Sequence, residues 1–164
     1  MSVEVRPAAA GDWPAIWPVF HEVVAAGETY AYDGALTSEQ ARVLWMEPAP
    51  GATVVATDDD VLLGTAKMGP NRPGRGAHVG TASFMVSSAA RGRGVGRLLA
   101  EHVVAWHRAQ GYRAIQFNAV VETNTVAVAL WRSLGFTIVG TVPEAFEHPV
   151  HGYVGLHVMH LPLV

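Results

Sequence analysis

A run of glycines and arginines from position 91 to 97 contains the residue types best suited to binding an anionic ligand. The run follows an apolar, strand-like segment at 79–87 and precedes an apolar pattern with helical spacing. Its backbone N–H groups therefore lie at the start of a helix, where they have no intrahelical partner and the helix dipole is positive. Gly92, Gly94 and Gly96 let the backbone turn sharply and approach a ligand closely. We expect this segment to bind phosphate oxygens.

Two common phosphate-binding motifs do not fit this run. A nucleotide P-loop requires Gly-Lys-Ser/Thr, whereas Gly96 is followed by Arg97 and Leu98. A dinucleotide-binding turn requires Gly-x-Gly-x-x-Gly, whereas the glycines here occupy every second position. A glycine-rich turn that binds no ligand is the alternative for this segment taken alone.

The charge of the chain favours a small anionic ligand over a nucleic acid. The formal net charge is -3, and phosphate polymers select basic surfaces. Within this acidic chain the arginines nevertheless gather in the middle of the sequence. These central arginines are Arg72, Arg75, Arg91, Arg93 and Arg97.

Composition and length indicate a globular, cytoplasmic protein with a single domain over residues 1–164. Hydrophobic residues make up 50% of the chain and charged residues 15%, which is typical of a folded protein with a buried core. No apolar run reaches the roughly 18 residues that span a bilayer, and the N-terminus lacks the layout of a signal peptide. The lack of cysteine excludes disulfides and thiolate nucleophiles. We therefore expect neither a membrane nor a nucleic acid among the partners.

Seven strands are expected where apolar residues alternate or cluster between turn signals. They occupy 3–6, 53–57, 61–68, 79–87, 114–121, 136–142 and 154–161. The segment 69–78, rich in glycine, proline and arginine, is predicted to be a loop. Strands and helices alternate in the C-terminal half, which indicates an α/β domain with a mixed sheet.

Two helices are expected between the first and second strands. One begins near Asp12 and contains Pro18, which is expected to kink it or delay its regular part. Its apolar face consists of Ile16, Val19, Phe20 and Val23. The other begins with a capping box formed by Thr37 and Gln40. Its buried residues are expected to be Ala41, Leu44 and Trp45.

Two further helices are expected in the C-terminal half. The first follows the glycine run and ends at Gly111. The second is capped by Asn124 and ends at Gly135. Each would cross from one strand to the next, so both are expected to pack against the sheet.

The glycine run and the segment of the last helix carry motifs that can be compared with known families. The run Arg91-Gly92-Arg93-Gly94-Val95-Gly96 resembles the Arg/Gln-x-x-Gly-x-Gly/Ala signature of the GNAT superfamily of N-acetyltransferases. The stretch 124–136, Asn-Thr-Val-Ala-Val-Ala-Leu-Trp-Arg-Ser-Leu-Gly-Phe, is similar to the superfamily's Asn-x-x-Ala-x-x-Leu-Tyr-x-x-x-Gly-Phe segment. The resemblance implies an acyltransferase with a mixed, mostly antiparallel central sheet, a splayed parallel strand pair, and helices on both faces.

The resemblance also implies a site for acetyl-CoA and no metal. Backbone amides from Arg93 to Arg97 would hold the pyrophosphate, and Arg91 would shape the loop or add charge. The preceding strand would be bulged and splayed from its neighbour, so that backbone groups of Met85 and Val86 pair with the pantetheine arm and one amide polarises the thioester carbonyl. The implied cofactor-binding residues are Met85, Val86, Arg91, Gly92, Arg93, Gly94, Val95, Gly96, Arg97, Asn124 and Trp131.

The implied reaction is direct transfer from acetyl-CoA to an amine in a ternary complex, where positioning supplies much of the rate. Trp131 stands where many members have a tyrosine that protonates the departing thiolate, and we expect it to pack against the arm or the core. The strand at 79–87 also lacks the carboxylate that many members carry there. Glu28, Glu122 and a chain of waters are the alternatives for the base. The candidates for an acid or a substrate wall are Tyr30, Tyr32 and Tyr153.

Asn118 lies on a strand that is otherwise strongly apolar. A buried amide must find partners, so it either bonds the splayed backbone or faces the cleft, where it would bind a substrate carboxylate. The segments 117–124 and 140–143 and the loop from residue 28 to 37 are similar to a GNAT subgroup that includes phosphinothricin and azetidine-carboxylate acetyltransferases. The resemblance therefore implies an amino acid or amino-acid mimic as the acceptor. A peptide or protein N-acetyltransferase and a non-catalytic acyl-CoA-binding domain are the alternatives.

Four histidines near the C-terminus raise the question of a metal site; they are His148, His151, His157 and His160. His157 and His160 are an odd number of residues apart in a predicted strand, so their side chains should point to opposite faces. We therefore expect no metal. The resemblance implies a homodimer, to which the apolar C-terminal strand would contribute.

Overall fold

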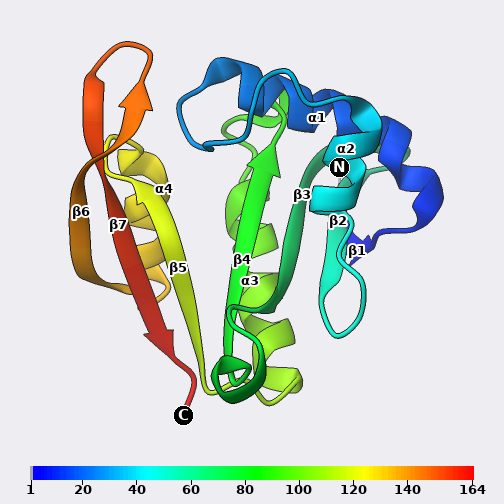
Figure 1. Cartoon of the computed structure of the whole chain (residues 1–164). Helices are drawn as coiled ribbons and strands as arrows, with labels where there is room; N and C mark the ends of the chain where they lie inside the picture. The colour runs from blue at the N-terminus through cyan, green and yellow to red at the C-terminus, as the bar shows by residue number, and fades with distance from the viewer. Residues whose placement is uncertain (1) are drawn as a thin grey trace.

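The computed structural model describes residues 2–164, and its strands form one mixed sheet (Figure 1). The strand order is β1-β2-β3-β4-β5-β7-β6. Every neighbouring pair is antiparallel except β4 and β5, which are parallel, so the predicted mostly antiparallel sheet is confirmed. The strands are β1 Val3–Pro7, β2 Ala52–Asp58, β3 Val61–Pro70, β4 Val79–Val86, β5 Ala114–Val121, β6 Thr137–His148 and β7 Gly152–Pro162.

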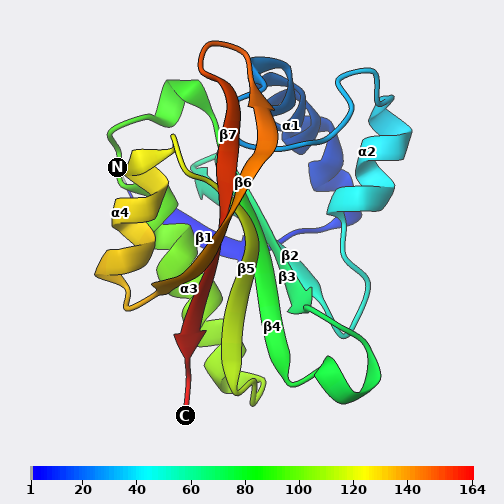
Figure 2. The same ribbon diagram turned by 60° about the vertical axis from the view of Figure 1, so that its left-hand side comes forward.

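Helices cover both faces of this sheet, as predicted (Figures 1 and 2). On one face α1 (Trp13–Ala26) and α2 (Ser38–Trp45) pack over β2, β3 and β4. On the other face lie α3 (Val95–Ala109) and α4 (Thr125–Ser133). The two faces of β4 follow the alternation of a strand, because Met85 packs with α1 whereas Phe84 and Val86 pack on the side of α3.

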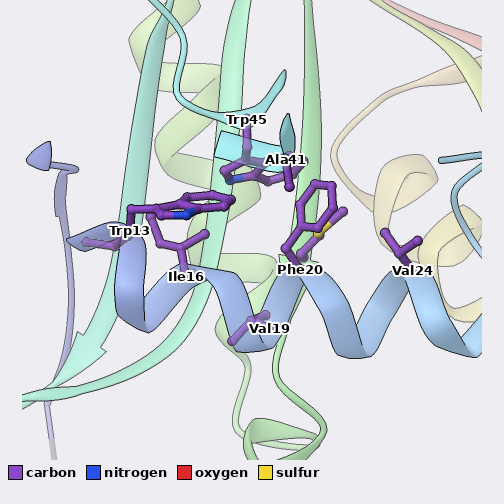
Figure 3. Close-up of a cluster of buried hydrophobic side chains, with 9 residues drawn as sticks. Trp13, Ile16, Val19, Phe20, Val24, Ala41 and Trp45 are labelled. Atoms are coloured by element: carbon purple, nitrogen blue, oxygen red, sulfur yellow. The ribbon is translucent and has the colours of Figure 1, made fainter. Parts of the chain in front are cut away.

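The core under α1 and α2 is aromatic and fixes both helices to the sheet (Figure 3). The rings of Phe20 and Trp45 meet edge to face with centroids 5.8 Å apart. The buried indole of Trp45 donates a hydrogen bond to Thr65 Oγ1 at 3.0 Å, and this hydroxyl donates in turn to Val54 O at 2.8 Å. Each polar group of this buried chain is therefore paired, which holds α2 in one position on the sheet.

The structure confirms one of the predicted helix starts and corrects details of the other. Thr37 and Gln40 form the predicted capping box. The carboxylate of Asp12 does not cap α1, because it accepts hydrogen bonds from the Arg6 guanidinium and from the N–H of Ala9. The helix α1 is assigned without a break through Pro18.

Other predicted boundaries and burials also change. Leu44, expected to be buried, is 41% exposed, because α2 turns Ala41 and Trp45 toward the sheet instead. The strand β3 runs on to Pro70, so the following loop is shorter than predicted. The last hairpin is longer than predicted, since β6 extends to His148 and β7 begins at Gly152.

The parallel strands β4 and β5 separate soon after they meet. Among residues 2–164 they pair at Val79 with Ala114 and at Gly80 with Ile115, and beyond these pairs they diverge (Figure 1). Glycine is required at position 80, because a Cβ there would overlap the ring of His107 on α3. The splayed parallel pair that the family resemblance implies is therefore present.

The bulge lies in the other strand of this pair from the one predicted. The strand β4 pairs with β3 in continuous register from Gly80 to Val86. The register shift is instead in β5, between Phe117 and Val120, where β5 has one residue more than β7. Asn118 lies in this bulge and is exposed, which corrects the expectation that its amide is buried.

Candidate active site

A cavity of about 670 Å³ occupies the opening between β4 and β5. It is lined by residues of both strands, of the loop between α1 and α2, of the segment before α3, and of α4. The same cavity therefore touches the glycine run, through Arg91 and Gly96, and the bulge of β5, through Asn118. Figure 1 shows the loop between α1 and α2 lying over the wide end of the opening.

The glycine run is shaped as an anion-binding turn. Gly92 and Gly94 have φ values of +76° and +74°, which side chains rarely adopt, and Gly94 is the N-cap of α3. The first helical hydrogen bond joins Leu98 N–H to Gly94 O at 3.0 Å, so the amides of the three residues between them have no acceptor within the helix. A Cβ added at Gly92 or Gly94 would meet no atom within 4 Å, so the space beside the turn is open.

The arginine side chains of this run hold the loop in place more than they line the cavity. Arg93 forms an ion pair of 2.6 Å with Asp58, at the end of β2. The backbone N–H of Arg93 donates a hydrogen bond to Ala90 O. Arg97 donates to Ser133 Oγ on α4 at 2.8 Å. Arg91 does line the cavity, whereas Arg72 and Arg75 are not among the lining residues.

Two predicted residues of the α4 segment also line the cavity. Asn124 caps α4, since its Oδ1 accepts a hydrogen bond from Ala127 N–H at 3.3 Å. Trp131 is 7% exposed, and its ring lies 4.8 Å from the rings of both Phe84 and Phe117, measured between centroids. The indole fills the space between α4 and the two diverging strands, which agrees with a packing role.

Tyr30 is hydrogen-bonded to the edge of β4 that faces the cavity. Its hydroxyl accepts a hydrogen bond from Phe84 N–H and donates one to Phe84 C=O, both at 2.7 Å. Because successive residues of a strand direct their backbone groups to opposite sides, Val86 also faces the opening, whereas Met85 faces Thr65 of β3. Two residues were predicted to pair with a ligand arm. Val86 presents its backbone to the cavity, whereas Met85 lines the cavity although its backbone groups are directed to β3.

Sequence analysis identified Tyr30 as a candidate site residue, but it predicted neither the role of Phe84 nor the contact between the two. The contact of Tyr30 with β4 joins residues 54 positions apart, and no local pattern signals it. The alternation along β4 would have pointed to Phe84. Burial raises the pKa of the Tyr30 phenol above its ordinary value, so this hydroxyl stays protonated and can donate. Tyr32 stacks on Tyr30 with centroids 5.8 Å apart but does not line the cavity.

The two predicted carboxylates lie in different places. Glu28 lines the cavity from the loop between α1 and α2. Glu122 is not among the lining residues, and its Oε1 accepts a hydrogen bond from Gly155 N–H at 2.7 Å. A third carboxylate, Glu22 on α1, lines the cavity and accepts from Ser88 N–H at 2.8 Å. Sequence reasoning missed Glu22, because on the helix it has the spacing of an ordinary solvent-facing residue.

Side-chain amides and hydroxyls form the part of the cavity away from the glycine run. Asn118 Nδ2 donates to Asn71 Oδ1 at 2.6 Å, and Asn118 Oδ1 accepts from Gln116 Nε2 at 2.9 Å. Thr81 and Ser83 line the cavity from β4. The structure therefore places Asn118 at the cleft. Tyr153, by contrast, is 66% exposed and lies outside the lining.

Neither a metal cluster nor a membrane span is found in the part of the chain that the structure describes. Between residues 2 and 164 no three His, Cys, Asp or Glu side chains lie close enough together to hold a metal ion. His157 instead shares a hydrogen bond of 2.6 Å with Thr141 Oγ1. None of the helices in this range combines the length and the apolar character that crossing a bilayer requires.

Known proteins resemble this chain in fold and in sequence. A GCN5-related N-acetyltransferase from Kribbella flavida has 66% sequence identity and a TM-score of 0.96, with 98% of each chain covered. An L-methionine sulfoximine/L-methionine sulfone acetyltransferase from Pseudomonas aeruginosa is 30% identical over 151 residues, which is 88% of this chain and 86% of the relative. A phosphinothricin acetyltransferase from Sinorhizobium meliloti, solved with acetyl-CoA, shares the fold with a TM-score of 0.88 at 23% identity, covering 99% of this chain and 89% of that one.

A family comparison agrees with these relatives and with the geometry. The acetyltransferase (GNAT) family matches residues 15–136, which include most of α1, the splayed strands, the glycine run and α4. The match covers well over half of the chain. This chain therefore belongs to the GNAT family of N-acetyltransferases.

Proposed function

We propose that this protein transfers an acetyl group from acetyl-CoA to the amine of an amino acid or amino-acid mimic, by direct attack in a ternary complex. The observation that carries the proposal is the continuity of the cavity, which runs from the anion-binding turn at α3 to the polar side chains on the bulge of β5. We call the part near Gly96 and Val86 the donor end. The part near Asn118 and Ser83 is the acceptor end.

The donor end fits CoA through its backbone. The free amides at the start of α3 suit the pyrophosphate, and the open side of β4 at Val86 suits the amide groups of a pantetheine arm, which would pair like an added strand. Acetyl-CoA supplies the activated thioester. We assign polarisation of its carbonyl oxygen to the Val86 amide, because the backbone of Met85 is directed to β3.

The acceptor end fits a small molecule with hydrogen-bonding groups. Asn118 can exchange its bond to Asn71 for one to a substrate carboxylate, and Thr81 and Ser83 offer hydroxyls on the opposite wall. The 30% identity to an enzyme named for methionine sulfoximine and methionine sulfone supports an amino-acid-like acceptor.

The reaction needs one base and no covalent enzyme intermediate. The amine nitrogen attacks the thioester carbonyl carbon, the C–N bond forms, and the C–S bond breaks to release the CoA thiolate. Glu28 accepts the proton lost by the amine, directly or through water, because it lines the cavity, whereas Glu122 does not and Glu22 is held by Ser88 N–H beside the glycine run. The thiolate takes up a proton from water, since Trp131 offers no acidic group.

The test is release of the CoA thiol from acetyl-CoA in the presence of candidate amines. The panel contains methionine sulfoximine, methionine sulfone, phosphinothricin, common amino acids, polyamines and short peptides. The chain has no cysteine, so the protein adds no background to a thiol reagent. Release with the amino-acid group supports the proposal, and release with peptides alone would indicate a peptide N-acetyltransferase. Binding of acetyl-CoA without release from any amine would indicate a non-catalytic acyl-CoA-binding domain.

Three further predictions accompany this function: a cytoplasmic location, a single domain over residues 1–164, and a homodimer. The exposed apolar residues Val139 and Val142 on the edge strand β6 support a contact there. Sedimentation of the purified protein would test the dimer, and a monomer at all concentrations would contradict it.

A further inference from the structure

The hydroxyl of Tyr30 takes the place of a neighbouring strand at one position of β4. It accepts from the N–H and donates to the C=O of the same residue, Phe84, which is the pair of bonds that a strand partner would make. Tyr30 comes from the loop between α1 and α2, on the other side of the opening from α3. The open side of β4 is therefore divided into a part that includes Val86 and a part that Tyr30 covers.

This division would end the path of a ligand arm along β4. We call the path from the start of α3 to Phe84 the donor track. An arm that is anchored at the start of α3 and runs along β4 reaches Val86 first and Phe84 second, because these residues alternate along the side that faces the opening. An arm on this path would meet the phenol of Tyr30 at Phe84, because the phenol already occupies the backbone groups of that residue. Its thioester and acyl group would then lie beside the ring of Tyr30.

The ring of Tyr30 is supported from behind. Tyr32 stacks on it at 5.8 Å between centroids, and Tyr32 in turn contacts Phe20 at 5.3 Å. Phe20 is 1% exposed in the aromatic core under α1 (Figure 3). Moving the phenol aside would disturb this packing and leave the N–H and C=O of Phe84 without their partner.

We propose that Tyr30 determines the length of the acyl group, by ending the donor track at the size of an acetyl group. This inference rests on the proposed function, in which an acyl-CoA is the donor. A propionyl or butyryl chain extends from the thioester into the space of the phenol, whereas an acetyl group stops short of it. Tyr30 is thus a specificity-determining residue that contacts the acyl group and takes no part in proton transfer.

The test compares the affinities of acetyl-CoA, propionyl-CoA, butyryl-CoA and CoA itself by calorimetry, so it needs no knowledge of the acceptor. The wild type is expected to prefer acetyl-CoA to butyryl-CoA by about tenfold or more, since a poorly accommodated methylene in a pocket costs about this much. In Tyr30→Ala the preference should fall to within about threefold. In Tyr30→Phe, which keeps the ring and loses both hydrogen bonds, it should fall part of the way.

Controls separate this inference from the proposed function. CoA has no acyl group, so its affinity should be the same in the wild type and both variants, which also shows that they fold. Tyr112→Phe removes a hydroxyl from a tyrosine beside His107, outside the cavity, and should leave the acyl preference unchanged. A wild type that binds all three acyl-CoAs equally, or Tyr30 variants with an unchanged preference, would overturn the assignment of Tyr30 alone. Failure of the wild type to bind any CoA compound would overturn the proposed function.

Discussion

The donor end and the acceptor end of the cavity differ in the groups that form them: mainly backbone groups at the donor end and side chains at the acceptor end. At the donor end the groups proposed to bind the ligand are mainly backbone amides, at the start of α3 and along β4, and side chains such as Asp58 and Arg93 hold that backbone in place. At the acceptor end the groups are side chains, such as Asn118 and Glu28, brought together from a strand bulge and a loop. A backbone site depends on the course of the chain, whereas a side-chain site depends on each residue that is present.

The strongest test of this contrast is Gly94→Glu. The substitution places a carboxylate at the cap of α3, where the donor phosphates would bind, and forces a side chain onto a φ of +74°. We expect CoA affinity to fall by at least about a hundredfold, as measured by calorimetry, because the new charge repels phosphate and fills the cradle.

Gly111→Glu is the matched control for Gly94→Glu. Gly111 has a φ of +83° at the other end of α3, and a Cβ there also meets no atom within 4 Å. Both variants carry similar backbone strain and the same charge. Equal CoA affinity in the two variants would contradict the assignment of the donor end.

The acceptor end should respond to Asn118→Asp without any change at the donor end. The new carboxylate repels an acceptor carboxylate and can no longer donate a hydrogen bond to it. We expect the KM for an amino-acid acceptor to rise by about tenfold or more, with the KM for acetyl-CoA within about twofold of the wild type. Gln110→Glu makes the same change from amide to carboxylate at the exposed end of α3, outside the cavity lining, and is the control. A rise in both KM values would show that the two ends are not separate.

A smaller effect is expected from Asp58→Asn, which removes the ion pair that fixes Arg93 in the glycine run and leaves the glycines intact. The ion pair with Arg93 is partly exposed, so its loss should weaken CoA binding by about fivefold. Asp60→Asn changes an exposed residue of the same turn and should leave the affinity unchanged. Calorimetry at low and high salt would measure both, and identical affinities would mean that the loop does not depend on this pair.

The smallest effect concerns His107 on α3, whose ring packs against Gly80 where β4 and β5 still pair. Burial lowers the pKa of His107 below its ordinary value, while its Nδ1 is bonded to Val103 O at 2.8 Å and its Nε2 has no hydrogen-bond partner among the described residues. The native state therefore binds a proton less readily than the unfolded state, so stability should decrease as pH falls through about 6.5 toward the lowered native pKa. Urea unfolding at pH 7.5 and 5.5 would show this decrease, and His107→Gln should lose part of it. An equal pH dependence in the variant would rule out His107 as its source.

The backbone features beside the donor end were predicted from the sequence better than the arrangement of side chains at the acceptor end, because local backbone conformation depends on neighbouring residues. The glycine run and the capping of α4 by Asn124 are encoded in short motifs, because each depends on backbone conformation over a few residues. The splayed pair joins distant segments and was predicted only through the family resemblance. The bulge was assigned to the wrong strand, since its position depends on how β5 pairs with β7, some 40 residues further along the chain.

Contacts between distant residues could not be predicted from the sequence alone. Tyr30 bonds a residue 54 positions away, and Glu22 bonds Ser88, which is 66 positions away. Neither contact leaves a local pattern of spacing. The same is true of the amide chain through Asn118, whose exposure follows from the bulge and was not evident from its apolar neighbours.

The open side of β4 also bears on how such an enzyme diverges. A ligand arm paired with the backbone at Val86 is recognised by groups that every residue except proline carries. Under the proposed function, we therefore expect mutations along this strand to change the side chains that face the acceptor while recognition of the donor is kept. Single substitutions would then give access to new acceptors without a stage in which the protein can no longer use its donor. The gap in the sheet would thus favour the evolution of new acceptor specificities, provided that the glycines at the start of α3 are kept.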